Sequence, residues 1–135
     1  MRHDRYLTIA ALAAVIMISM GCIAGGKPSQ QAMDAANVTA DRMLNAINAG
    51  DYAQFTQNFS STIKSAVDEN RFNVIKSNMT GAYGKYVSRA PVPTATSVQG
   101  YNVFLYDCQF EKSNVTVQFT MNPSDVWAVE GFFYR

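Results

Sequence analysis

The stretch that decides the fold is residues 101–134, which reads YNVFLYDCQFEKSNVTVQFTMNPSDVWAVEGFFY. It contains three runs of alternating character, 102–110, 114–121 and 127–134, which are separated by short polar connections. In the second run the alternation is strict, with Val115, Val117, Phe119 and Met121 on one face and Asn114, Thr116, Gln118 and Thr120 on the other. This period of two, rich in β-branched and aromatic residues, predicts half-buried antiparallel strands. A three-stranded meander with one apolar face needs a second layer to cover it.

The residues before the meander are expected to supply that layer as three helices. Apolar residues at helical spacing predict a first helix over 29–49 that stops at Gly50. Asp51 is expected to cap a short second helix, with Gln54 in the reciprocal capping-box position and one or two further turns at 63–67. Asp68 is expected to cap a third helix, which the glycines at 81 and 84 close.

Residues 85–99 are predicted to form a single strand at the edge of the sheet. Pro91 and Pro93 lack the amide hydrogens that a central strand donates, so an edge position or a loop is required. The fold class is therefore α+β, with three N-terminal helices packed on a curved antiparallel sheet of about four strands.

The N-terminal residues are typical of an export signal. Arg2 and Arg5 precede an apolar run over 7–20, which Gly21 and Cys22 follow. Residues 19–22 resemble a lipobox, which predicts lipidation of Cys22, although Ser19 departs from the usual aliphatic residue. An uncleaved membrane anchor and a cleaved, secreted form are the alternatives. We expect a leader or anchor over 1–22, a flexible tether over 23–29 and the domain over 30–135, on the outer face of the cell membrane.

Charge and composition exclude several function classes. Residues 1–22 contain two of the 11 basic residues and one of the 10 acidic residues, so nine of each remain in the rest of the chain. This balance of charge argues against a nucleic-acid partner. The single histidine, His3, lies in the leader, so a mature domain has no Ser-His or Cys-His mechanism. It also lacks the usual zinc ligands and any phosphate-binding loop. We therefore expect no metal, no cofactor and no enzyme activity.

The chain resembles an uncharacterised family of small exported bacterial and archaeal domains with the fold of nuclear transport factor 2, also called cystatin-like. The residues that carry the resemblance are Ala49-Gly50-Asp51-Tyr52, Phe55, Phe59, Phe72, Gly84-Lys85-Tyr86, residues 106–112, Val115-Thr116-Val117 and residues 131–134. The resemblance implies a cone of helices and a curved sheet over residues 35–135. It brings no established catalytic residues.

Aromatic residues are the candidates for a ligand pocket inside such a cone. The candidates are Tyr52, Phe55, Tyr83, Tyr86, Tyr106 and Trp127. They would bind a small apolar ligand, although the aromatic core that a small domain needs is the alternative explanation. Cys108, in an apolar strand, is interpreted as a small core residue rather than as a nucleophile, and a disulfide with Cys22 is the alternative.

Three functions follow from these observations. The first is a non-enzymatic, membrane-tethered domain that binds a small apolar ligand or a protein partner. The second is an interaction module, often a homodimer in this fold, that uses its exposed sheet face through Thr116, Gln118, Thr120 and Glu130. The third is an enzyme that uses Asp107 as a general base in a pocket with Tyr83, Tyr86 or Tyr106, while the alternation alone assigns Asp107 to the solvent face.

Overall fold

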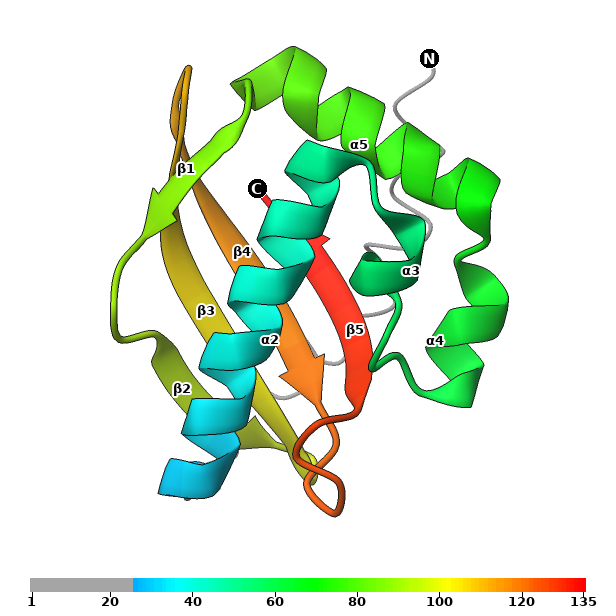
Figure 1. Cartoon of the computed structure of the whole chain (residues 1–135). Coiled ribbons are helices and arrows are strands. Elements are labelled where there is room, and N and C mark those ends of the chain that lie inside the picture. Colours follow the sequence, from blue (N-terminus) through cyan, green and yellow to red (C-terminus); the bar gives the residue numbers. More distant parts are fainter. Residues whose placement is uncertain (1–25) are drawn as a thin grey trace.

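The computed structural model describes residues 26–135, in which helices gather on one side of an antiparallel sheet and α2 runs across β3 and β4 (Figure 1). The helices are α2 (Gln30–Ala49), α3 (Tyr52–Phe55), α4 (Ser61–Ala66) and α5 (Glu69–Tyr83). The strands are β1 (Tyr86–Arg89), β2 (Thr94–Val98), β3 (Tyr101–Phe110), β4 (Asn114–Met121) and β5 (Val129–Tyr134). The α+β class and the C-terminal meander are confirmed. The leader and Cys22 lie outside the described residues.

The sheet has five strands in the described part of the chain, so the prediction of a single edge strand over 85–99 is wrong. The strand order is β1-β3-β4-β5, and β2 pairs with the same edge of β3 that β1 uses. Tyr86 lies opposite Phe110, and Thr94 lies opposite Leu105. The segment between β1 and β2 contains both prolines, which remove amide donors and therefore divide the predicted strand into two.

Four helices form in residues 26–135, where the sequence predicts three. The N-caps predicted at Asp51 and Asp68 are confirmed, because each side chain accepts a hydrogen bond from the amide three residues later. Ser29, predicted as the first residue of the helix, is the N-cap of α2 and accepts from the Ala32 amide in the same way. Ser60 is the additional cap, with an extended backbone and its Oγ 3.5 Å from the amide nitrogen of Ile63, and it starts α4 as a separate helix. The reciprocal half of the Asp51 capping box is wrong, since the Asp51 amide donates to Ala46 O at 2.9 Å.

Two glycines terminate helices, and one predicted terminator does not. Gly50 caps α2 with φ 71°, as predicted. Gly81 lies within α5, which ends at Gly84, where φ is 81° and ψ is −160°. A Cβ at Gly84 would lie 2.7 Å from the Cβ of Glu111. Glu111 is held there because its Oε1 accepts a hydrogen bond from the Lys85 amide at 2.8 Å.

The core lies between the helices and the inner face of the sheet. Phe55 packs its ring against Phe59, Phe72 and Phe132, at centroid distances of 5.4, 4.9 and 5.4 Å. These rings come from α3, the segment after it, α5 and β5, so they join the helical layer to the sheet. Burial of aromatic side chains of this size is a main source of stability in a small domain.

The outer face of β4 differs from the prediction. Asn114 is exposed, but Gln118 and Thr120 are 2% and 0% exposed, so the strand is half-buried only in its first part. The register places Gln118 between Leu105 and Phe133, whose larger side chains flank it on a central strand. Gln118 Nε2 and Thr120 Oγ1 have no hydrogen-bond partner among the described residues.

Side chains and loop backbone pair with the edge strands. Asn48 of α2 donates through Nδ2 to Tyr86 O at 2.9 Å and accepts from Tyr86 N at 3.0 Å, so its amide bonds both backbone groups of a β1 residue. On β5, Val129 O accepts from Ser60 N at 2.9 Å, and Val129 N donates to Asn58 O at 2.8 Å. These bonds attach both outer strands to the helical layer.

The chain enters the described domain beside β2. Ser97 N donates to Gly26 O at 3.2 Å, and residues 26–29 then lead into α2 without helical structure. Within residues 26–135, none of the helices combines the length and apolar character that a membrane crossing requires.

Candidate functional site

The predicted aromatic pocket residues lie in separate parts of the structure. Tyr52 and Phe55 both contact Phe72, at centroid distances of 5.9 and 4.9 Å, and the Tyr52 hydroxyl donates to Val67 O at 2.9 Å. Phe55 is fully buried. This pair therefore belongs to the packing between α3 and α5.

The other candidates occupy three further positions. Tyr83 and Tyr86 both pack against the ring of Phe110, at centroid distances of 5.8 and 5.6 Å. Tyr106 is fully buried, and its hydroxyl donates to Asn37 Oδ1 at 2.7 Å. Trp127 lies in the connection between β4 and β5 and is 41% exposed.

The void beside these core rings is small. Its volume is about 10 Å³, and it is lined by Phe55, Phe59, Ile63, Val67, Ile75, Gly131 and Phe132. A cavity needs about 10–15 Å³ on this measure to hold a single water molecule. The void therefore has no room for an organic ligand without movement of the surrounding side chains.

A larger hollow opens at the β1, β3 and β4 end of the sheet. Its volume is about 500 Å³, and its lining consists of Ser88, Arg89, Ala90, Asp107, Cys108, Gln109, Asn114, Val115, Thr116 and Arg135. Side chains alternate along β3, so the exposed Asp107 and Gln109 point to the face away from the helices, while Cys108 and Phe110 point inward.

Strand register brings the polar residues of this hollow together. Asp107 pairs with Thr116, whose amide donates to Arg135 O at 2.9 Å, so an acidic and a basic residue flank Thr116. In the next row Gln109 pairs with Asn114 on β4. The side chains of Asp107, Gln109 and Asn114 make no hydrogen bond with another described residue. As far as residues 26–135 are concerned, these three side chains are available to bind solvent or a ligand.

Sequence reasoning predicts only part of this site. It singles out Asp107 and Thr116 and assigns Asp107 to the solvent face, which is confirmed. The alternative pocket of Asp107 with Tyr83, Tyr86 or Tyr106 does not form, because Asp107 is exposed on the outward face of β3 while all three tyrosines pack in or against the core on the helix side. The same alternation could have predicted Gln109 as a residue of this site, because Gln109 shares the outward face of β3 with Asp107.

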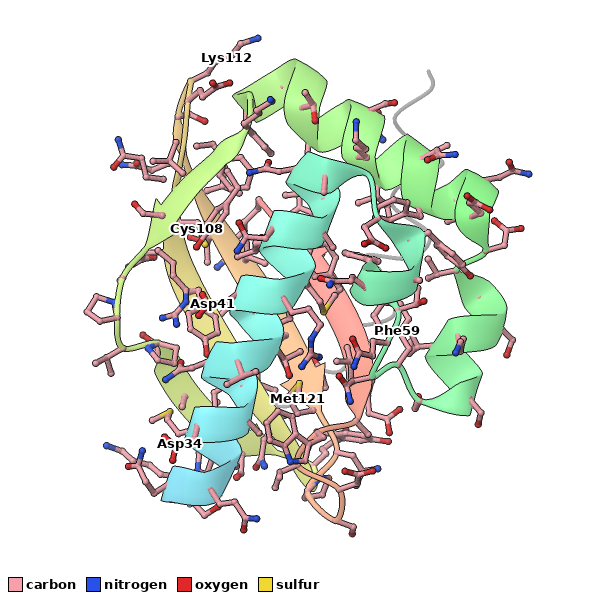
Figure 2. All side chains as sticks on the ribbon, in the orientation of Figure 1. Asp34, Asp41, Phe59, Cys108, Lys112 and Met121 are labelled. Atoms are coloured by element: carbon pink, nitrogen blue, oxygen red, sulfur yellow. The ribbon has the colours of Figure 1, made fainter. Side chains whose placement is uncertain are left out.

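An ion pair joins α2 to β1 through Arg89, which also lines the hollow, and its partner Asp41, which Figure 2 labels on α2. Arg89 Nε donates to Asp41 Oδ1 at 2.7 Å, and Nη2 donates to Oδ2 at 3.1 Å. The Arg89 guanidinium carbon lies 5.1 Å from the centre of the Tyr106 ring, a cation–π distance. The hydrogen bond to Asp41 raises the pKa of Arg89, because it stabilises the charged guanidinium. The same bond joins β1 to α2.

Cys108, beneath the hollow, is unsuited to nucleophilic chemistry. Burial raises the pKa of its thiol to about 12, so the thiol stays protonated at neutral pH. It forms no disulfide within the described residues. Residues 26–135 contain no group of three or more His, Cys, Asp and Glu side chains arranged to hold a metal ion.

Comparison with known proteins gives one family match. Residues 40–125 match the family described as "Protein of unknown function (DUF3887)", a span that runs from α2 to the β4–β5 connection and includes most of the hollow. Neither the curated proteins nor the solved structures contain a match to this chain.

Proposed function

The chain belongs to this family of unknown function, and we propose that it is a non-enzymatic domain, tethered outside the cell membrane, that binds a polar segment of a protein partner in the hollow. The observation that carries the proposal is a set of polar side chains on the hollow's wall, Asp107, Gln109 and Asn114, that form no hydrogen bond with any other residue of 26–135.

The chemistry of the wall suits a peptide. Gln109 and Asn114 each offer both a donor and an acceptor, which is what an extended backbone requires. Asp107 and Arg135 add one charge of each sign on either side of Thr116. A segment that carries both charged and neutral polar groups would therefore find a partner for each.

Several features support a binding role over catalysis. The chain's single histidine is His3, outside the described residues. Asp107 is exposed and has no hydrogen-bonded neighbour that would orient it as a general base. The buried thiol of Cys108 is kept protonated. The packed interior also supports a partner at the surface over a small apolar ligand inside the domain.

The predicted export signal and the lipobox-like residues before Gly26 support the tether. Gly26 bonds to Ser97, and Ser97 lies in the same cross-strand row as Asn102 and Met121. Thr116, in the hollow, is five residues along β4 from Met121, which corresponds to about 17 Å. A tether at Gly26 would therefore hold the hollow away from the membrane, where a partner can reach it.

The architecture supports two further parts of the proposal. Helices followed by a twisted antiparallel sheet with bulges in β1 and β5 suit the nuclear-transport-factor-2-like cone.

A homodimer is the second candidate, because Leu105 and Phe133 place apolar surface beside Gln118 on the outward face. Sedimentation of the purified chain over a hundredfold concentration range distinguishes a dimer from a monomer.

Photo-crosslinking tests the hollow. A benzoylphenylalanine is placed at Gln109 of the full chain in its native host, and the matched control carries it at Gln57, an exposed position after α3. We expect one protein adduct from position 109, none from position 57, and loss of the adduct when Asp107→Arg is added. Equal adducts from both positions, or no protein adduct from position 109, would overturn the proposal.

A further inference from the structure

The connection between β4 and β5 lies at the end of the domain where the chain enters. Gly26 pairs with Ser97, and the cross-strand row continues through Asn102 to Met121, the last residue of β4. Residues 122–128 follow at once. Figure 1 shows this connection and the start of α2 at the same end of the molecule.

This connection holds an indole outward. Trp127 is 41% exposed, the most exposed aromatic ring among the large hydrophobic residues of the described chain. Its amide donates to Asp125 Oδ1 at 3.1 Å, while Ala128 N donates to Asp125 O at 2.9 Å and Asn122 N donates to Ala128 O at 3.0 Å. Val126, which precedes Trp127 in the sequence, packs against the core. These bonds fix the conformation of the loop, and this conformation exposes the ring of Trp127.

We propose that Trp127 contacts the lipid headgroup region and sets the orientation of the domain on the membrane. This inference rests on the tether proposed above. Gly26 is four residues further along the chain than Cys22, so a lipid on Cys22 keeps Gly26 within about 14 Å of the anchor. Three strand spacings, about 15 Å, separate Gly26 from the end of β4. A small tilt therefore brings Trp127 to the membrane.

The chemistry of this end favours an interfacial contact over an electrostatic one. Tryptophan concentrates at membrane–water interfaces because its ring is apolar and its N–H is polar. Lys27 and Asp125 are the exposed charges of residues 26–29 and of the loop, and they have opposite signs. Binding of this end to lipid should therefore depend little on salt or on anionic lipid.

The contact is measurable because Trp127 is the single tryptophan of the chain. The full chain, purified from membranes, is reconstituted into phosphatidylcholine vesicles with or without lipids brominated near the headgroup. We expect bromolipid to quench the tryptophan fluorescence, and vesicles to shield it from aqueous iodide. The control carries Trp127→Phe and Val87→Trp, which moves the ring to an exposed site of β1 near the hollow. Its quenching by bromolipid should be lower by at least about twofold.

Vesicle flotation separates the two ways of failing. If the chain floats with vesicles but Trp127 is quenched no more than the ring at position 87, the orientation is wrong and the tether stands. If the full chain does not float, the tether fails and the orientation fails with it. Flotation with selective quenching of Trp127, unchanged at 0.5 M salt, is the supporting result.

Discussion

Arg89 of β1 binds Asp41 of α2 through two parallel hydrogen bonds, 2.7 and 3.1 Å long, across 48 residues of sequence. The same guanidinium donates to Ala90 O at 3.0 Å and to Pro91 O at 3.3 Å. It therefore fixes the segment where the chain leaves β1 for β2, next to the hollow. The pair acts as a clamp between the helical layer and one wall of the proposed binding site.

Asp41→Asn should lower the free energy of unfolding by about 1 kcal/mol, because it weakens a bidentate, charge-assisted pair. The effect stays modest because the Asp41 side chain is 52% exposed and solvent screens it. Asp34→Asn is the control, an exposed acid on the same helix that only accepts a bond from Gln30. Urea denaturation measures both, and equal effects would contradict the clamp.

Gly84→Ala should destabilise the domain by about 2–3 kcal/mol, since the backbone there has φ 81° and the new Cβ meets Glu111 at 2.7 Å. Gly81→Ala is the matched control within α5, where a Cβ meets nothing within 4 Å. This second variant should be neutral or stabilising by up to about 1 kcal/mol. Thermal and urea unfolding of the two variants give the comparison, and a mild Gly84→Ala variant would mean that the turn relaxes.

Cys108 should make the domain less stable at alkaline pH. Its pKa is raised by burial from 9.0 to about 12, so the folded state keeps a proton that the unfolded state releases above pH 9. This contribution is fully present below pH 9 and is lost as the pH rises towards 12. Between pH 8 and 9.8 the loss amounts to about 1 kcal/mol.

Cys108→Ala provides the control for that pH dependence. The variant lacks the thiol and should not show this part of the loss, whereas the burial that raises the pKa of Tyr86 to about 12 remains in both proteins and only the smaller Coulombic contribution of Cys108 to that shift is removed. The comparison is between slopes of unfolding free energy against pH, because the cavity in the variant lowers stability at every pH. Identical slopes would mean that the thiol is accessible.

Phe55→Ala should cost about 3–5 kcal/mol, because it removes a fully buried ring that contacts three others. Val74→Ala, at a position of α5 that is 42% exposed, should change stability by less than about 0.5 kcal/mol. Urea unfolding of each variant tests this. A loss near 1 kcal/mol for Phe55→Ala would indicate a loosely packed interior with room for a ligand.

The features that the sequence predicts well depend on local signals. The caps at Asp51 and Asp68 act within one helical turn, and Gly50 ends α2 through its own backbone freedom. The alternation in β3 likewise assigns Asp107 and its inward neighbours to the correct faces. Such signals need no knowledge of what packs against them.

The features that it misses depend on residues far apart in the chain. Two prolines predict a broken edge but leave open whether one strand or two remain, and pairing with β3 decides the matter. The hollow combines Ser88, Asp107, Asn114 and Arg135 from three strands and the chain's last residue, so its composition follows from register. Alternation gives the direction of each side chain but not the identity of its neighbours.

The pairing of Asn48 with Tyr86, and of Asn58 and Ser60 with Val129, has a consequence for aggregation. Open edges of a sheet recruit strands from other molecules, and that risk grows with local concentration. Molecules confined to a membrane surface are concentrated in two dimensions. If the proposed tether confines the domain to such a surface, neighbouring copies can crowd together there without joining their sheets, because an amide side chain and a loop already hold backbone groups of β1 and β5.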